Sequence, residues 1–486
     1  MLLRNTIFNV LGLGGPLIAA IFTIPYLISE LGVERFGLLT LIWAVVSYFG
    51  LFDLGLGRAL THQVAITCSR DESQDLPSIT GTAYLIMLAL GLCAGLIMAL
   101  AAPFIVGQIE SVPDMTEAIN AIYAMAVAMP FIVLTSGFRG VLEARHAFGI
   151  INLIRLPMGL FTFLGPAAVV LLLEPRLDSI AWVLVIGRVV GCIVHAFFSV
   201  RSLPKKYRKL NVSRAWVRPL CISGGWLTVS NVISPLMGYL DRFIIGALVS
   251  TAAVAYYATP NEIITKLWII PGALTAVLFP TFASLIGRGG GEAQALFKKV
   301  LLWLFLAMLP IVLVFILFAE DILRLWIDGD FASQSGTILR ILAGGILINS
   351  LAHIPFTLIQ SSGNARVTAI VHVCEFPLFL LALCLLTVNY GVEGAAWAWL
   401  LRMVIDTFIM FNCAMPILGM RATVLTNIKF LFPLLFLPVM IWFGENVSFY
   451  LRLMVFGVVM IFSIVILVNN LLADKTSKVG FGGSVK

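Results

Sequence analysis

Long apolar runs separated by short polar segments make up most of this chain. A run of roughly 20 apolar residues is enough to cross a bilayer as a helix. About fourteen such runs are present, which predicts an all-α integral membrane protein. Their approximate bounds are 6–28, 37–61, 80–107, 118–138, 151–173, 179–200, 220–247, 254–280, 299–318, 336–360, 368–388, 393–416, 424–443 and 449–472.

The composition supports this class. Of 486 residues, 60% are hydrophobic and 11% are charged, whereas a soluble protein carries roughly 25% charged residues. The net charge of +7 fits the basic loops of a membrane protein, and without a clustered basic face on a folded domain it does not predict nucleic-acid binding. The seven cysteines lie in or beside apolar runs without metal-ligand spacing, so they are interpreted as packing residues and no metal site is predicted.

The loops carry their positive charges unequally. With a cytoplasmic N-terminus, the loops opposite the cytoplasm hold only Arg35, Arg176, Arg324 and Arg452, and most other loop Lys and Arg residues fall on the cytoplasmic side. Positive residues concentrate in cytoplasmic loops, so both termini are predicted to be cytoplasmic. No small-residue cleavage site follows the first apolar run, which is expected to stay as a span.

A basic segment at 201–218, RSLPKKYRKLNVSRAWVR, follows the sixth run. It predicts a six-helix lobe at 1–203, a basic cytoplasmic linker at 204–218, a second six-helix lobe at 219–417, and two peripheral helices with a cytoplasmic tail at 418–486. A weak repeat supports two halves, because NVLG near Asn9 and NVIS near Asn231 lie at similar offsets from segments that pair Phe36 with Tyr257. Substrate sites in repeat-built transporters lie between the repeats, near the bilayer midplane.

Ionisable residues interrupt the apolar runs. The stretch Asn231–Ala283 contains Asp241, Arg242, Glu262 and Lys266. Such groups are costly in hydrocarbon and usually face a water-filled cavity or a partner. Basic residues in or beside the spans outnumber the obvious acids, which favours an anionic cargo; they are Arg58, Arg155, Arg188, Arg242, Lys266, Arg340 and Arg402.

Several motifs, in order along nearly the whole chain, resemble one known family. The first hairpin contains Pro25, Gly32, Glu34, Phe36, Gly37, Asp53 and Gly55 in IPYLISELGVERFGLL and FDLGLG. Later come VLEARHAFGIINLIR, Pro280 with Thr281, LIQSSGNARVTAI and YGVEGAAWAW. Together these segments resemble the Wzx-type flippases, the polysaccharide transporter family of the MATE-like MOP superfamily.

The resemblance implies a fold and a function. The implied fold is a V-shaped pair of six-helix bundles around a central cavity, with two extra C-terminal helices. The implied function is to flip a polyprenyl-pyrophosphate-linked oligosaccharide from the cytoplasmic to the outer leaflet of a bacterial inner membrane, by alternating access, for O-antigen or other surface polysaccharide biosynthesis. The expected partners are lipid-linked oligosaccharide, membrane lipids and assembly proteins such as a polysaccharide polymerase. No cofactor is expected, and a proton or a sodium ion is left open as the coupling ion.

A pyrophosphate headgroup in a low-dielectric passage needs positive partners. Arg supplies a planar fork for phosphate and Lys a point charge. The hypothesised headgroup contacts are Arg188, Lys266, Arg402 and Arg242. Arg188 is the least compensated of them, because no acid lies three or four residues away on its own helix.

Other interpretations of these residues remain open. Two pairs are four residues apart and could each be neutralised within one helix: Glu262 with Lys266, and Arg402 with Asp406. Arg242 could instead anchor its helix at the membrane interface. Asp53, Glu262 and Asp406 are the hypothesised gate or ion-coupling carboxylates, with Glu375 as a further candidate. Asp53 could instead support helix packing beside two glycines.

Two other functions compete with the flippase. A cation-coupled multidrug or small-molecule exporter of the same superfamily predicts an acidic cavity. A membrane glycosyltransferase or polymerase would need a large polar loop or a carboxylate cluster at the membrane face, and the longest outer loop, around Glu320–Ser335, is short. No catalytic triad or metal-ligand motif is present in the sequence, so a transporter is favoured over an enzyme.

Overall fold

The computed structural model describes residues 2–49, 53, 55–69, 73–204, 206, 208–286, 291–420 and 437–481. Its described secondary structure is helical, and ten helices in this part of the chain are long and apolar enough to cross a membrane. The all-α membrane class is therefore confirmed, while the count of fourteen spans stays a prediction. The chain forms two compact units, Met1–Ala255 and Tyr256–Lys486. The predicted division into lobes at 1–203 and 219–417 stays a prediction.

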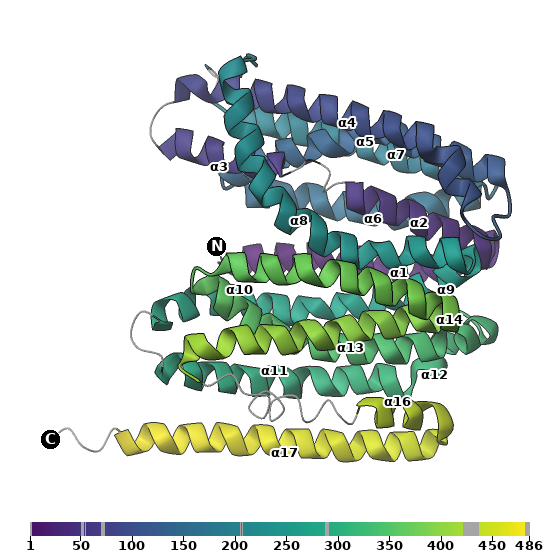
Figure 1. Cartoon of the computed structure of the whole chain (residues 1–486), viewed down its shortest axis with the longest axis vertical. Helices are drawn as coiled ribbons and strands as arrows, with labels where there is room; N and C mark the ends of the chain where they lie inside the picture. The colour runs from purple at the N-terminus through teal and green to yellow at the C-terminus, as the bar shows by residue number, and fades with distance from the viewer. Residues whose placement is uncertain are drawn as a thin grey trace. The chain divides into compact units, whose positions relative to one another are not determined.

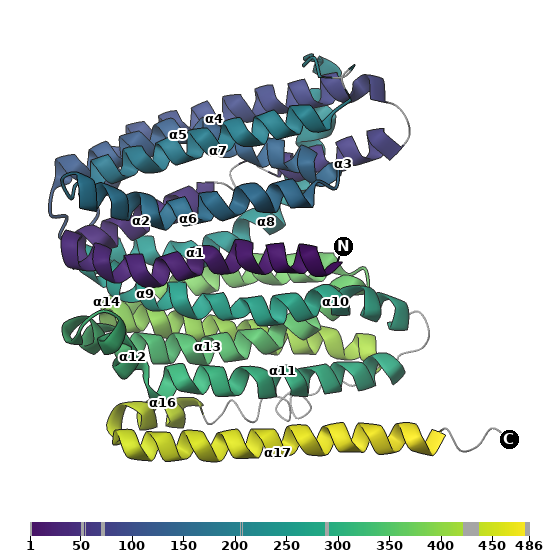
Figure 2. The ribbon, with the colours of Figure 1, turned by 180° about the vertical axis from the view of Figure 1, so that it is seen from behind.

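The N-terminal unit is built mainly from long helices. In Figure 1, α5 lies between α4 and α7, and Figure 2 shows α1 running along α6. The elements are α1 (Leu2–Leu31), α2 (Val33–Phe49), α3 (Leu56–Ser69), η1 (Ser73–Asp75), α4 (Leu76–Gly107), α5 (Met115–Ala144), α6 (Phe148–Leu172), α7 (Leu177–Ser202), α8 (Arg214–Leu248) and the start of α9 (Thr251–Ile264).

The second predicted span, 37–61, is two helices instead of one. Helix α2 ends at Phe49 and α3 begins at Leu56. Gly55, between them, has φ +70°, a left-handed conformation that glycine adopts readily. An aspartate beside such a glycine offers its carboxylate to backbone N–H groups in competition with the helix, and Asp53 does so here, as described below.

The motif LGVERFG forms a turn and a close helix contact. Gly32 ends α1 with φ +77°. A Cβ atom at Gly37 would collide with the backbone carbonyl of Thr251 at the start of α9, so only glycine lets α2 approach so closely. Phe36 between these glycines is fully buried, as is Tyr257, its counterpart in the repeat.

The basic segment 201–218 is held against the start of α4. The backbone N–H of Asn211 donates to the carbonyl of Pro77 at 3.0 Å, and that of Ser213 donates to Thr82 Oγ1 at 2.9 Å. Gly81 makes room for this contact, since a Cβ there would meet the carbonyl of Asn211. The segment therefore packs within the N-terminal unit.

The C-terminal unit is organised around α13. This helix is the most buried candidate span and packs against α10, α11, α12 and α14 (Figure 1). The unit contains most of α9, then η3 (Thr265–Trp268), α10 (Ile269–Ile286), α11 (Gly291–Leu317), α12 (Ala319–Trp326), α13 (Gly329–Ser361), α14 (Ala365–Ala414), η4 (Met415–Leu418), α16 (Leu437–Asn446) and α17 (Phe449–Phe481).

Helix α14 contains two predicted spans, 368–388 and 393–416. The chain reverses at Gly391, which has φ +59° and ψ −140°. The two arms fold back on each other and pack closely. A Cβ at Gly394 would collide with the carbonyl of Leu386, so only glycine fits there. The glycines of YGVEGAAWAW thus make a tight helical hairpin. The expected outer loop Glu320–Ser335 folds instead as α12 and the start of α13, and the predicted span 424–443 lies largely outside the described residues.

Candidate functional site

Arg188 places an uncompensated positive charge within the N-terminal unit. It lies near the middle of α7, a candidate span, and its side chain is half-buried. No hydrogen bond or ion pair holds it among the described residues, and no acid there acts on its charge. His195, seven residues further along the same helix, bonds the Gly191 carbonyl at 2.8 Å. Arg188 therefore keeps its guanidinium donors available for an anion.

Arg242 is held within α8 in the same unit. It is buried together with Asp241, whose carboxylate accepts the backbone N–H of Arg242 at 2.8 Å. Its guanidinium lies 5.5 Å from the ring centroid of Tyr239, a cation–π distance. This burial disagrees with an interfacial anchor, and the local contacts give Arg242 a structural function that Arg188 lacks.

Asp53 lies at the break between α2 and α3, where its carboxylate accepts hydrogen bonds. Its carboxylate accepts the backbone N–H groups of Gly55 and Gly57, each at 3.0 Å, and the hydroxyl of Ser136 on α5 at 2.8 Å. Among the described residues no basic side chain pairs with it. These contacts match the packing interpretation and show no gate salt bridge.

Removal of the Asp53 carboxylate is expected to weaken folding more than transport. Asp53→Ala should cost about 1–2 kcal/mol, the range for losing a side chain that caps a helix start, and the thermal unfolding of purified protein measures this loss. Asp53→Asn keeps an acceptor oxygen and should transport nearly as well as the wild type. Loss of ion dependence in a folded Asp53→Asn variant would restore Asp53 as a coupling residue.

Arg35 and Glu117 form an ion pair that sequence spacing does not predict. Arg35 Nη2 lies 3.3 Å from Glu117 Oε2, and Glu117 is almost completely buried. The same carboxylate accepts the backbone N–H of Leu177. One buried acid thereby joins the starts of α2, α5 and α7. The two residues are 82 positions apart in the sequence, so no local spacing indicates this pair.

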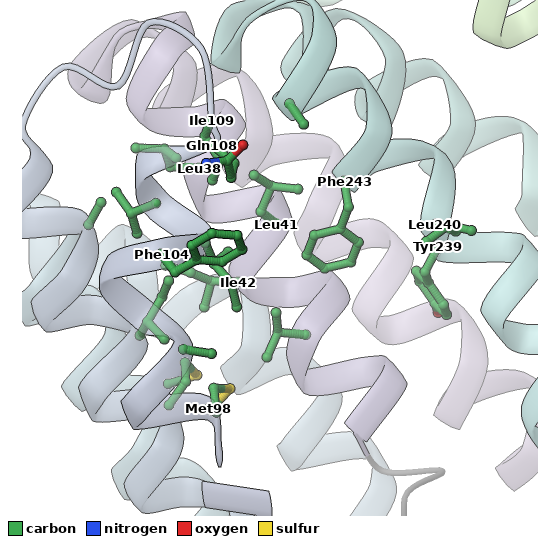
Figure 3. Close-up of a pocket in the computed structure, with 18 of the residues that line it drawn as sticks. Leu38, Leu41, Ile42, Met98, Phe104, Gln108, Ile109, Tyr239, Leu240 and Phe243 are labelled. Atoms are coloured by element: carbon green, nitrogen blue, oxygen red, sulfur yellow. The ribbon is translucent and has the colours of Figure 1, made fainter. Parts of the chain in front are cut away.

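The N-terminal unit also contains an apolar cavity of about 590 Å³. Leu38 and Leu41 of α2 line it together with Phe104 of α4 and Phe243 of α8, and Figure 3 shows both aromatic rings facing this space. Among the described residues of the lining, Gln108 is the main polar side chain and none is charged. The cavity can accommodate hydrocarbon but is chemically unsuited to a charged headgroup, and Arg188 is not part of it.

In the C-terminal unit, Lys266 and Glu262 form the predicted ion pair within one helix. Lys266 lies in the 3₁₀ segment η3. Pro271, four residues beyond Leu267, accounts for this distortion, since proline has no N–H for that carbonyl and its ring crowds it. A 3₁₀ stretch inside a span often marks a hinge. The ion pair with Glu262 largely compensates the positive charge of Lys266.

Arg402 and Asp406 do not form the expected local pair. Asp406 Oδ1 lies 3.7 Å from His372 Nε2 on the other arm of α14. Arg402 instead stacks over the ring of Phe379, 5.3 Å from its centroid, and acts electrostatically on Glu375. The hairpin at Gly391 explains the difference, because it brings the opposite arm closer to each side chain than the next turn of its own helix.

His372, Glu375 and Asp406 form a buried polar cluster. One polar atom of each lies within 4.8 Å of the others, so the cluster could enclose a small cation. Glu375 and Asp406 are only 4% and 7% exposed, and neither carboxylate oxygen of Glu375 has a hydrogen-bond partner. Sequence reasoning named the two acids without grouping them. A hairpin at Gly391 would have predicted their proximity, since they lie sixteen and fifteen residues from it.

The hypothesised residues are therefore distributed over both units. Arg188, Arg242 and Asp53 belong to the N-terminal unit, and Lys266, Glu262, Arg402 and Asp406 to the C-terminal unit. The structure brings Glu262 to Lys266, and Asp406 to His372 and Glu375. Of the basic candidates, Arg188 is the one whose charge no described acid offsets.

The sequence matches two known families. Residues 2–286 match a family described as "Polysaccharide biosynthesis protein", and residues 227–386 match the MatE family. A "Putative O-antigen transporter" of Shigella flexneri is 30% identical over 411 residues, which is 84% of this chain and 96% of the relative. A "Probable flippase AglR" of Haloferax volcanii is 25% identical over 81% of this chain and 79% of its own length.

Solved structures share the fold. The lipid II flippase MurJ in an inward closed conformation superposes with a TM-score of 0.70 at 14% identity, over 96% of this chain and all of that one. An inward-facing multidrug resistance MATE transporter of the MOP superfamily gives a TM-score of 0.70 at 14% identity, over 84% and 98% of the two chains. At such identities the similarity establishes the fold alone.

Proposed function

Since this chain belongs to the polysaccharide biosynthesis protein family, we propose that it is a transporter of the MOP superfamily and that it flips a polyprenyl-pyrophosphate-linked oligosaccharide. It is a multi-pass membrane protein of the flippase type and not an enzyme. The observation that carries the proposal is the similarity, over 84% of this chain, to a protein named "Putative O-antigen transporter".

Arg188 is the residue we assign to the headgroup. A pyrophosphate leaves water when it enters the membrane, and a guanidinium can replace lost water contacts with two parallel hydrogen bonds. A half-buried arginine without a described acidic partner supplies that charge without first breaking an ion pair. Lys266, Arg402 and Arg242 are secondary candidates, because each already has local contacts.

The proposed transport cycle is alternating access. The headgroup enters from the cytoplasmic side, contacts Arg188, and leaves to the outer leaflet after the two halves of the protein have rearranged. The 3₁₀ segment before Pro271 supports a bend in that span during the cycle. The hydrocarbon tail stays in an apolar environment, which the cavity lined by Leu41 and Phe243 could supply.

The proposal includes a location and partners. The similarity to an O-antigen transporter of Shigella flexneri supports a bacterial inner membrane location, and the unequal loop charges support a cytoplasmic position for both termini. A lipid-linked oligosaccharide delivered to the outer leaflet needs enzymes that use it there, so a polysaccharide polymerase and other assembly proteins are the proposed functional partners.

The exporter remains the competing function, because the buried acids Glu375 and Asp406 are what a cation carrier would use. Ligand-dependent thermal stability of the purified protein separates the two. A polyprenyl-pyrophosphate oligosaccharide should raise the unfolding temperature of the wild type and have less effect on Arg188→Gln, whereas a lipophilic drug cation should have little effect on either. Stabilisation by the drug cation alone would favour the exporter.

A further inference from the structure

We propose that Glu375 and Asp406, with His372 at their side, form a proton-binding site that couples a proton gradient to transport. This inference rests on the proposed function and adds the coupling ion and its residues. The cluster lies entirely within the C-terminal unit, on the two arms of α14. None of its residues lines the apolar cavity, and Arg188 belongs to the other unit.

The burial of Glu375 calls for a positive partner. Both of its carboxylate oxygens are buried and have no hydrogen-bond partner among the described residues. An ionised carboxylate in such surroundings neutralises itself or binds a cation. Asp406 is buried on the facing arm, and its Oδ1 also lacks a hydrogen bond. The two acids therefore share a space with too few donors for two negative charges.

A single proton balances the charges of this cluster. Glu375 and Asp406 contribute two negative charges, and Arg402, which acts on Glu375 across the hairpin, contributes one positive charge. With neutral histidines the sum is −1, and one proton brings it to zero. A divalent metal ion would leave a net positive charge in apolar surroundings. Ca²⁺ and Mg²⁺ also take six or more oxygen ligands, more than these side chains supply.

The neighbouring groups provide a route for the proton. His372 is the more exposed member, with 19% of its side chain accessible against 10% for Asp406, and its ring stacks on Phe356 of α13. Histidine exchanges protons near neutral pH more readily than any other side chain. His353, also on α13, is the titratable residue of that packed helix within electrostatic reach of Asp406. His372 would pass a proton to one carboxylate, –COO⁻ becoming –COOH, and take it back when the proton leaves.

Infrared spectroscopy of the full-length protein in lipid nanodiscs tests the site without any substrate. The carbonyl stretch of a protonated carboxyl group should be present at neutral pH in the wild type and disappear at higher pH. It should be lost or shifted in Glu375→Gln and in Asp406→Asn. Glu393→Gln is the matched control, since Glu393 lies on α14 but outside the cluster, and this variant should keep the band. Glu375→Asp, which keeps the carboxyl group, should shift the band and retain it.

Three results would overturn the inference: no protonated carboxyl in the wild type at neutral pH, a band unchanged in both neutral variants, or a sodium or zinc ion bound in a one-to-one ratio that Glu375→Gln abolishes. If Glu375→Gln does not fold, Asp406→Asn and Glu375→Asp still decide between these outcomes.

Transport in proteoliposomes separates this inference from the proposed function. A gradient of one pH unit should change the final distribution of the lipid between the leaflets by up to about tenfold in the wild type, the limit for one proton per cycle, and should leave the distribution in Glu375→Gln unaffected. Transfer that ignores the gradient in the wild type would overturn the proton site and leave the flippase standing. No transfer, with the carboxyl band intact, would overturn the flippase and leave the proton site standing.

Discussion

Arg188→Glu is expected to abolish transfer of a lipid-linked oligosaccharide while the protein stays folded. The guanidinium is half-buried in α7 and makes no hydrogen bond with described residues, so its loss breaks no internal contact there. Arg188→Gln should slow transfer by about 10- to 100-fold, the effect of losing one charged hydrogen bond of roughly 1.5–3 kcal/mol. Charge reversal should slow it further, because it adds repulsion. Transfer rates in proteoliposomes measure both variants.

Two controls make the Arg188 result specific. Arg188→Lys keeps the charge but loses the planar fork, so it should retain more transfer than Arg188→Gln. Arg155→Glu reverses a charge on the neighbouring helix α6 at an exposed position and should transfer nearly as fast as the wild type. Unchanged transfer by Arg188→Glu would remove this residue from the substrate path.

Arg340→Ala is expected to be the most destabilising single substitution considered. Arg340 on α13 is buried, with only 3% of its side chain accessible. It donates to the backbone carbonyl of Gly444 at 3.2 Å and lies 3.9 Å from Glu320. Its removal leaves that carbonyl without this donor and weakens the contact of α16 with α13, which keeps the hydrogen bond from Thr337 to Glu445. The expected cost is about 2–3 kcal/mol, visible as a lower unfolding temperature in detergent.

Arg324→Ala is the matched control for Arg340. Arg324 pairs with the same acid, Glu320, at 2.8 Å, but 61% of its side chain is exposed. An exposed pair of this spacing contributes about 0.5 kcal/mol or less, so Arg324→Ala should unfold almost as the wild type does. Equal losses in the two variants would contradict the importance of burial at Arg340.

Local spacing in the sequence predicted contacts well where one helix holds both partners. Glu262 and Lys266 are four residues apart on one helix and pair as expected. Arg402 and Asp406 have the same separation and do not pair, because the hairpin at Gly391 offers them Phe379 and His372 instead. Spacing along one helix cannot predict such partners unless the turn between the arms is also recognised.

Apolar run length predicted the class of fold but missed breaks inside spans. The run 37–61 is apolar enough to be predicted as one span, yet Asp53 and Gly55 divide it into α2 and α3. Run length measures only the cost of exposing side chains to lipid. It does not register a carboxylate that captures backbone N–H groups, nor the buried pair of Arg35 with Glu117, which depends on three helix starts meeting in space.

The measurement that tests the central claim most directly follows a polyprenyl-pyrophosphate oligosaccharide between the leaflets of liposomes containing the purified protein. The wild type should transfer it faster than protein-free vesicles, and Arg188→Glu, reconstituted to the same level, should not. A drug cation should not be accumulated by the same vesicles. Drug-cation uptake without lipid transfer, or lipid transfer that Arg188→Glu leaves intact, would contradict the account of a flippase that holds its headgroup at Arg188.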